Sequence, residues 1–337
     1  MYMKKVIIVL LAMIGLVSCN GGKTFKIKVN LDNSTGKTVL LQKYAGGDLQ
    51  TIQTAVANNN TVEFKVNKSD NTDALHLMID GWRRPVVIFA DNQDMTVSGD
   101  YQKAGAITVT GSDMQARLNQ FIQEFESMED ENAMGVMAMG FVKENIDNPM
   151  GAYVLYRYKW AFSENDMKML YQALPVDMQS GYKVLTIEYL KGLEKVSIGK
   201  PYTNIIQNDV NGNAMKLSDM IGKTKVIIID FWASWCPDCR KENPELVKIY
   251  NEYKNKGLDI FSVSLDNDAA AWKKGITDDN LSWSHHVSDL QGWKNAAAGD
   301  YCISFIPQNV VLDENGVIVK KNVPMNRMRD VLNSFLK

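Results

Sequence analysis

The fold is decided by residues 230–239, which read DFWASWCPDC. They follow an apolar run from Val226 to Phe231, interrupted only by Asp230, as is typical of a strand buried on both faces. An amphipathic segment from Glu245 to Tyr253 comes after them and predicts a helix. The motif therefore lies where a strand passes through a short loop into a helix, and Cys236 is expected at the helix N-terminus.

This position divides the chemistry between the two cysteines of the motif. Unpaired amides and the helix dipole favour an anion at a helix N-terminus, which lowers the pKa of the Cys236 thiol and supplies the thiolate that attacks disulfides. Cys239 follows in the first turn, so it can resolve the mixed disulfide while being less exposed itself. We therefore predict thiol–disulfide exchange at Cys236 and Cys239.

A Cys-x-x-Cys pair is also half of many zinc sites. Zinc would need two more ligands, and apart from Cys19 the chain offers only Cys302 and the distant His76, His285 and His286. The strand before the motif fits the redox form of the pair instead. We predict no metal, and no cofactor beyond the two thiols.

The region around the motif, residues 196–337, alternates strand and helix patterns, as in an α/β layer. A second buried strand is expected from Leu258 to Leu265. The letters DENG at residues 313–316 lie between two apolar runs and predict a hairpin that joins 309–312 to 317–320.

Several separated segments of this region share the pattern of one known family. They are Gly199-Lys200-Pro201, Lys216-Leu217-Ser218-Asp219, the run from Phe231 to Cys236, Pro244, and the stretch from Tyr301 to Ile306-Pro307. Together they resemble the TlpA/ResA-like branch of extracytoplasmic thioredoxin-fold proteins. The resemblance implies a thioredoxin-like fold over residues 196–337 and a kink at Pro244. It also implies a cis bond between Ile306 and Pro307, which face the active site.

The resemblance gives roles to two acidic residues. Asp230 matches the buried aspartate of thioredoxins, and a carboxylate in an apolar strand should have a raised pKa and exchange protons with the resolving thiol. Glu242 matches a glutamate near the active site of ResA-like members. The alternative for Glu242 is a solvated helix face shared with Arg240 and Lys241.

The sequence also departs from the family pattern beside the two thiols. Many members have proline immediately before the second cysteine, whereas here Pro237 follows Trp235-Cys236 and Asp238 takes that place. The family's redox potential is therefore not carried over. Cys302 is atypical as well, and its apolar setting before Pro307 favours an inert buried thiol over a third redox partner.

Residues 1–19 differ in kind from the rest of the chain. Lys4 and Lys5 precede an apolar run from Val6 to Val17 that is too short to span a bilayer comfortably, as in an export signal. The segment ends in LVSC, which resembles the lipobox of bacterial lipoproteins, whose cysteine is lipidated. The alternative is a signal anchor or a coincidental cysteine. We predict a lipid anchor at Cys19 that holds the protein to a membrane on the periplasmic side.

Residues 24–112 predict a small antiparallel β-sandwich. Apolar and polar residues alternate as in half-buried strands, with the apolar set at Phe25, Ile27, Val29 and Leu31 and again at Val62, Phe64 and Val66. Turn-forming clusters separate such runs.

Residues 113–195 predict a helical segment. Helices are expected over 114–129, 149–160 and 179–190, with another that begins at a Ser163 cap. A methionine cluster within this segment could form a soft-metal or adaptable binding site, but we interpret it as core filler or a loosely packed turn; it comprises Met134, Met137 and Met139.

Residues 24–195 more weakly resemble the β domain and helical segment that precede thioredoxin-like domains in lipoproteins of Bacteroidetes. The region shows no paired carboxylates, metal spacing or phosphate loop, so no activity follows from it. We expect it to bind or position a partner.

Composition restricts the partners. The chain has 337 residues, 45% hydrophobic and 23% charged, which is ordinary for globular protein, and its 37 Lys plus Arg nearly balance 39 Asp plus Glu. No basic surface argues for nucleic acid.

The leading hypothesis is a membrane-tethered disulfide reductase. It would receive electrons from a membrane thiol transporter and act on exported proteins with disulfides or on cytochrome maturation intermediates. One alternative is a peroxiredoxin-like peroxidase, although the Ser-Trp-Cys context at Cys236 lacks the Thr/Ser-x-x-Cys setting of those enzymes. The other is a binding module whose thioredoxin domain is only structural.

Overall fold

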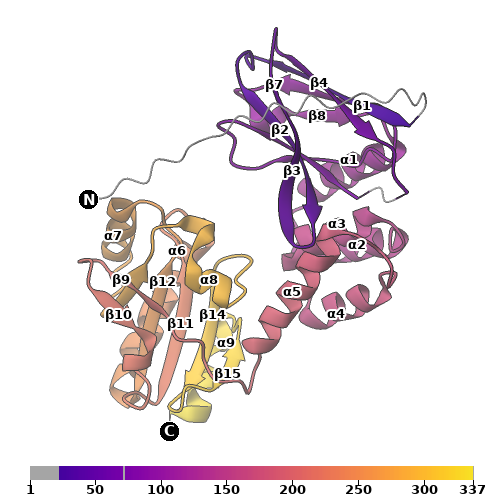
Figure 1. The fold of residues 1–337 in the computed structure, drawn as a ribbon. Coiled ribbons are helices and arrows are strands. Elements are labelled where there is room, and N and C mark those ends of the chain that lie inside the picture. Colours follow the sequence, from indigo (N-terminus) through magenta and orange to yellow (C-terminus); the bar gives the residue numbers. More distant parts are fainter. Residues whose placement is uncertain (1–22, 71–72, 337) are drawn as a thin grey trace, which may run out of the picture. The chain divides into compact units, whose positions relative to one another are not determined.

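The computed structural model describes residues 23–70 and 73–336, which form two compact units divided after Ile122 (Figure 1). The signal peptide expected over residues 1–19, with the lipidation site Cys19, lies outside the described residues. Within the described ranges no helix combines the length and apolar character needed to cross a membrane.

The first unit contains two four-stranded sheets. One has the order β4 (Thr61–Asn67), β1 (Thr24–Asp32), β7 (Met95–Asp100), β8 (Thr108–Thr110); the other has the order β3 (Asp48–Val56), β2 (Thr38–Ala45), β5 (Leu75–Ile79), β6 (Val86–Ile88). Ile27 and Leu31 of the first sheet share one buried core with Leu41 and Leu77 of the second, which confirms the predicted sandwich. One detail was wrong: β1 and β7 pair in parallel, because the chain crosses to the other sheet between them.

Five α-helices follow. They are α1 (Asp113–Glu126), α2 (Glu131–Glu144), α3 (Pro149–Arg157), α4 (Glu164–Ala173) and α5 (Gly181–Lys195). The side chains of Asn148, Ser163 and Ser180 cap α3, α4 and α5 by accepting backbone N–H groups. The sequence did not predict α2, which contains the methionine cluster: the three methionines are half-buried on a helix rather than in a turn.

The second unit ends in a seven-stranded mixed sheet. Its order is β10 (Ala214–Lys216), β9 (Ile206–Asp209), β13 (His285–Ser288), β12 (Leu258–Ser264), β11 (Val226–Trp232), β14 (Gln308–Asp313), β15 (Ile318–Lys321). β11 pairs in parallel with β12 and antiparallel with β14, and every residue of it is buried. The predicted hairpin is confirmed as β14–β15. This is the arrangement of a thioredoxin-like sheet.

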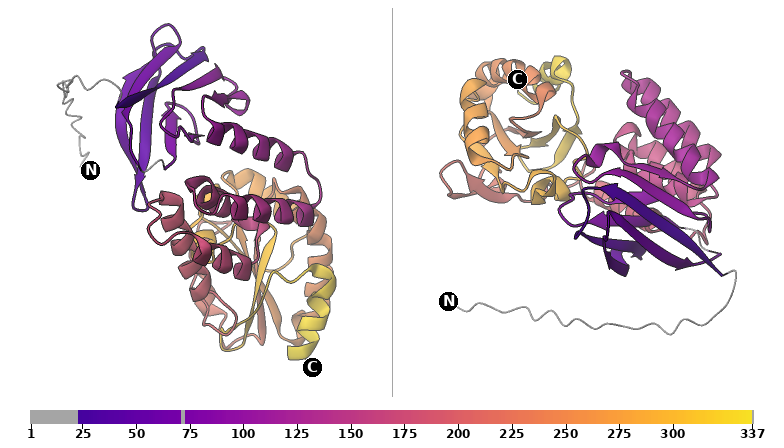
Figure 2. Two further views of the ribbon diagram at one scale, coloured as in Figure 1. Left: turned by 90° about the vertical axis from the view of Figure 1, so that its right-hand side faces the viewer. Right: turned by 90° about the horizontal axis from the view of Figure 1, so that it is seen from above.

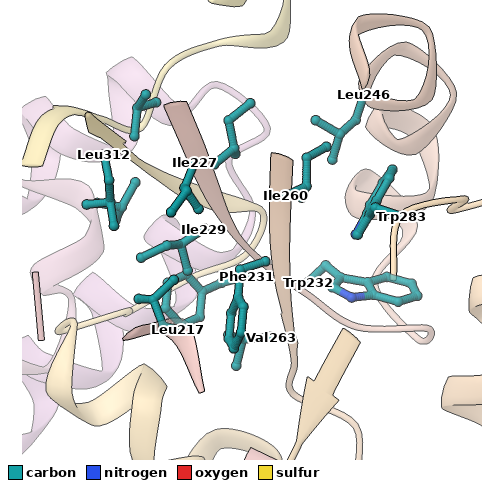
Figure 3. Close-up of a cluster of buried hydrophobic side chains, with 14 of the residues drawn as sticks. Leu217, Ile227, Ile229, Phe231, Trp232, Leu246, Ile260, Val263, Trp283 and Leu312 are labelled. Atoms are coloured by element: carbon teal, nitrogen blue, oxygen red, sulfur yellow. The ribbon is translucent and has the colours of Figure 1, made fainter. Parts of the chain in front are cut away.

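Helices pack beside this sheet (Figure 2). They are α6 (Pro237–Tyr253), α7 (Ala269–Asp278), α8 (Ala296–Asp300) and α9 (Met325–Phe335). Short 3-10 turns complete the described elements of the chain: η1 (Ala104–Ala106), η2 (Lys159–Ala161), η3 (Leu217–Asp219), η4 (Lys254–Lys256) and η5 (Gly292–Lys294). Figure 3 shows Trp232 and Trp283 grouped with Leu246 and Ile260 in the core. Burial of β11 in this core fixes the point at which the chain leaves the sheet for α6.

Candidate active site

Cys236 and Cys239 are joined by a disulfide at the start of α6. Cys236 is the N-cap residue, and its Sγ accepts a hydrogen bond from the backbone N–H of Cys239 at 3.1 Å. Pro237 occupies the first helical position, where its missing N–H is not needed. Cys236 is 4% exposed and Cys239 is 1% exposed. The less buried of the two cysteines thus also receives an amide donor at its sulfur, which favours its thiolate after reduction.

The loop before β14 lies against the disulfide. The Ile306–Pro307 peptide bond is cis, the geometry that the family resemblance implied. The Ile306 carbonyl oxygen lies 3.8 Å from the Cys236 Sγ. Gln308 shapes the loop, because its Oε1 accepts the N–H of Ser304 at 3.1 Å. A polypeptide bound along this loop would therefore lie directly beside the attacking sulfur.

Asp230 is a buried carboxyl on β11. Burial raises its pKa to about 7, since the charged form loses its water, and Glu242 adds a smaller effect in the same direction. The Ser262 hydroxyl donates a hydrogen bond to Asp230 Oδ2 at 2.9 Å and partly opposes that rise. Asp230 therefore changes its protonation near neutral pH, as a group that exchanges protons with a thiol must do.

Glu242 lies in the first half of α6 and is half-buried. Desolvation, followed by the charge of Asp238, raises its pKa. Arg240 does not pair with it, because its guanidinium binds Asp279 and donates to the Ser234 carbonyl at 3.2 Å. Glu242 thus makes no ion pair with Arg240, and its role in catalysis stays a prediction.

Asp266 holds the loop that carries the motif, a role that the sequence did not predict. Its carboxylate accepts the Ser234 N–H at 2.9 Å and the Ser234 hydroxyl at 2.6 Å. The Ser264 hydroxyl donates to the same group at 2.7 Å. Asp266 is 1% exposed and follows the carboxyl end of β12, beside the end of β11. In the sequence, the only sign of this role was an acidic residue immediately after the buried strand predicted from Leu258 to Leu265.

Exposed aromatic side chains lie next to both parts of the site. Trp235 is 49% exposed and Trp293 is 48% exposed, with ring centroids 6.3 Å apart. The Trp235 indole N–H donates to the Leu265 carbonyl at 3.3 Å, which orients the ring. Phe305, adjacent to Ile306, is 41% exposed. Solvent-exposed aromatic side chains beside a reactive cysteine are typical of a surface that binds a polypeptide.

Metal chemistry gains no support from the residues that the structure describes. No group of three or more His, Cys, Asp or Glu side chains in them could hold a metal ion.

Cys302 has a free thiol that is partly rather than fully buried, and burial raises its pKa.

A Cys-x-x-Cys disulfide at a helix N-terminus, beside a cis-proline loop that leads into a strand of a mixed sheet, defines a thioredoxin-like redox domain. Residues 197–334 match the Redoxin family, and residues 25–118 match a domain of unknown function, DUF4369. A thiol-disulfide oxidoreductase ResA from Bacillus cereus is 31% identical over 128 residues, which cover 38% of this chain and 70% of ResA. The chain belongs to the ResA family of thiol-disulfide oxidoreductases, and its CxxC active site is Cys236–Cys239.

Two further proteins are similar to the same part of the chain. ResA of Bacillus subtilis (strain 168) is 26% identical over 140 residues, covering 42% of this chain and 74% of that protein. A solved thioredoxin domain of a Bacteroides vulgatus thiol-disulfide oxidoreductase is 33% identical, covering 42% of this chain and 99% of that domain, with a TM-score of 0.39. Together with the Redoxin match, the likeness to ResA confirms the predicted fold class, family and enzyme class.

Proposed function

We propose that this oxidoreductase works as a reductase of protein disulfides, tethered by lipid outside the cytoplasm. Reduction of substrates, rather than their oxidation, is supported by Asp238, which is exposed between the two cysteines in the first turn of α6. A negative charge there opposes a thiolate on Cys236 and raises its pKa. That destabilises the reduced form relative to the disulfide and makes the protein a better reductant.

The reaction uses the reduced dithiol. The Cys236 thiolate attacks one sulfur of a substrate disulfide, forms a mixed disulfide, and releases the other sulfur as a thiolate that takes up a proton. Cys239 then gives its proton to the Asp230 carboxylate and attacks Cys236 Sγ, which releases the second substrate thiol. The substrate gains two electrons and the protein is left as the disulfide. A membrane thiol transporter would return those electrons by the reverse exchange.

The proposed location rests on residues 1–19, whose LVSC ending resembles a lipobox in which Cys19 would be the lipidated residue. On the periplasmic side the substrates would be exported proteins with disulfides or cytochrome maturation intermediates. The exposed rings of Trp235, Trp293 and Phe305 support a polypeptide substrate over a small peroxide. Nucleic acid is not among the proposed partners.

Trapping tests the proposal. In Cys239→Ser the mixed disulfide on Cys236 cannot be resolved, so disulfide-linked partners should accumulate in cells. Cys302→Ser, which removes a thiol outside the motif, should accumulate none. Wild type should also speed insulin reduction by dithiothreitol. If Cys239→Ser captures nothing and wild type reduces nothing, the reductase proposal fails; peroxide consumption without either result would favour the peroxidase alternative.

A further inference from the structure

A cavity of about 440 Å³ lies beside the cis-proline loop, on the second unit of the chain. Ser304, Phe305 and Gln308 line it from the redox domain. Lys159 and Tyr189 line it from the helical segment that precedes that domain. The helical segment therefore supplies one wall of a hollow whose other wall is the loop next to the disulfide.

Contacts between the two walls are close. The Tyr189 hydroxyl donates to the Cys302 carbonyl at 3.2 Å. A Cβ added to Gly192 of α5 would lie 2.6 Å from the Cys302 Sγ, so a larger residue there would force the helix or the Cys302 side chain to shift. The helix and the start of the loop are thus packed against each other, and the cavity between them is built into the fold.

Two lysines line this cavity without a salt bridge. Lys159 and Lys321 are both half-buried, and among the described residues no carboxylate lies within ion-pair distance of either. Glu164, the one acidic residue that lines the cavity, is 2.6 Å from Lys168 instead.

The surroundings of these lysines favour an incoming anion. The Lys159 ammonium lies 4.6 Å from the Tyr156 ring centroid and 5.3 Å from that of Tyr189. Burial lowers the pKa of Lys159 and of Lys321, because the charged ammonium loses water there, and at Lys321 the charge of Glu164 partly opposes this effect. A carboxylate would offset that cost through charge-assisted hydrogen bonds.

The cavity is within reach of a substrate chain bound at the disulfide. Ile306 places its carbonyl 3.8 Å from the Cys236 Sγ, and the two residues before it, Ser304 and Phe305, line the cavity. An extended chain advances about 3.3–3.6 Å per residue. A side chain roughly two to four residues from the substrate cysteine would therefore reach the part of the cavity that Ser304 and Phe305 line.

We infer that this cavity, which we name the lysine cavity, selects protein substrates that carry an aspartate or glutamate two to four residues from the reactive cysteine. The inference rests on the proposed reductase function and adds a substrate class to it. The helical segment is then a specificity element of the redox domain.

Matched peptides test the inference. Each carries one cysteine as a mixed disulfide with 2-thiopyridine, and the peptides differ only in having Glu, Gln or Lys three residues from that cysteine. The reduced full-length protein supplies two electrons and releases the peptide thiol and 2-thiopyridone, whose absorbance gives the rate. A charge-assisted hydrogen bond of about 1.5 kcal/mol corresponds to roughly a tenfold preference for the Glu peptide over the Gln peptide.

Variants test whether the two lysines cause the preference for the Glu peptide. Lys159→Met and Lys321→Met should each reduce the Glu-to-Gln rate ratio towards one. Lys320→Met, on the exposed neighbouring position of β15, should keep the full ratio. Glu and Gln peptides reduced equally fast by wild type would overturn the cavity inference alone. If none of the peptides is reduced, the reductase function and the inference both fail.

Discussion

Replacing Asp230 by asparagine should stabilise the oxidised protein at and above neutral pH. Burial raises the pKa of this carboxyl from 3.8 to about 7, a difference of about 3 pKa units. At 1.36 kcal/mol per unit, ionising Asp230 in the folded state costs about 4 kcal/mol relative to the unfolded chain. Asparagine carries no charge, and its amide oxygen can keep the hydrogen bond from Ser262, so the variant avoids that cost.

The pH window follows from the direction of the shift. Between pH 3.8 and about 7 the folded carboxyl still holds its proton whereas the unfolded one has lost it. The folded state therefore binds more protons, and its stability falls as the pH rises through this window. Below pH 3.8 both states are protonated and the cost is absent. The advantage of Asp230→Asn should thus grow from near zero at about pH 4 to about 4 kcal/mol at pH 8.

Hydrogen exchange of the β11 amides is the suitable assay, because it reports the opening of the unit that contains Asp230. Asp300→Asn, which changes an exposed aspartate of the same domain, should leave the pH profile unaltered. An Asp230→Asn effect that is equal at pH 4 and pH 8, or that favours wild type at pH 8, would refute the assignment of the raised pKa to Asp230. In activity assays the variant should release trapped substrate more slowly, since the proton acceptor proposed for Cys239 is lost.

Two further predictions concern charge and anchoring. Asp238→His should lower the Cys236 pKa and raise the redox potential by a few tens of millivolts, at roughly 30 mV per pKa unit, from a wild-type value nearer about −270 mV than −120 mV. Glutathione-equilibrium titration measures both potentials, and a downward shift would show that Asp238 is not the controlling charge. Cys19→Ala should abolish labelling by a fatty-acid analogue and leave unprocessed or misplaced precursor; label retained on the variant would contradict the lipid anchor.

The sequence predicted the parts of the site that are contiguous in the chain. The apolar run predicted β11, because local hydrophobicity determines a buried strand. The motif after it predicted the helix start at Cys236, because local capping residues determine where a helix begins. The position of Asp266 was not predictable in the same way. It meets Ser234 only because β12 pairs with β11 in a parallel register that places Asp230 opposite Ser262. Nothing local in the sequence fixes that register.

The missed helix α2 has a different cause. It contains Gly135 and Gly140, and glycine lowers helix propensity by about 1 kcal/mol per residue relative to alanine. Val136 of this helix is exposed whereas Ala138 is buried, so its apolar residues do not form a single face. Packing against α3 supplies the stability that the local pattern did not indicate.

The edges of the seven-stranded sheet bear on how such a protein meets incompletely folded chains. The outer strands are short: β10 has 3 residues and β15 has 4, and β15 ends in Lys320-Lys321. Long unpaired edges recruit extended polypeptides by strand addition, and brevity and lysine both suppress this. A client chain therefore finds little backbone to extend the sheet, and release after reduction does not require peeling away an added strand.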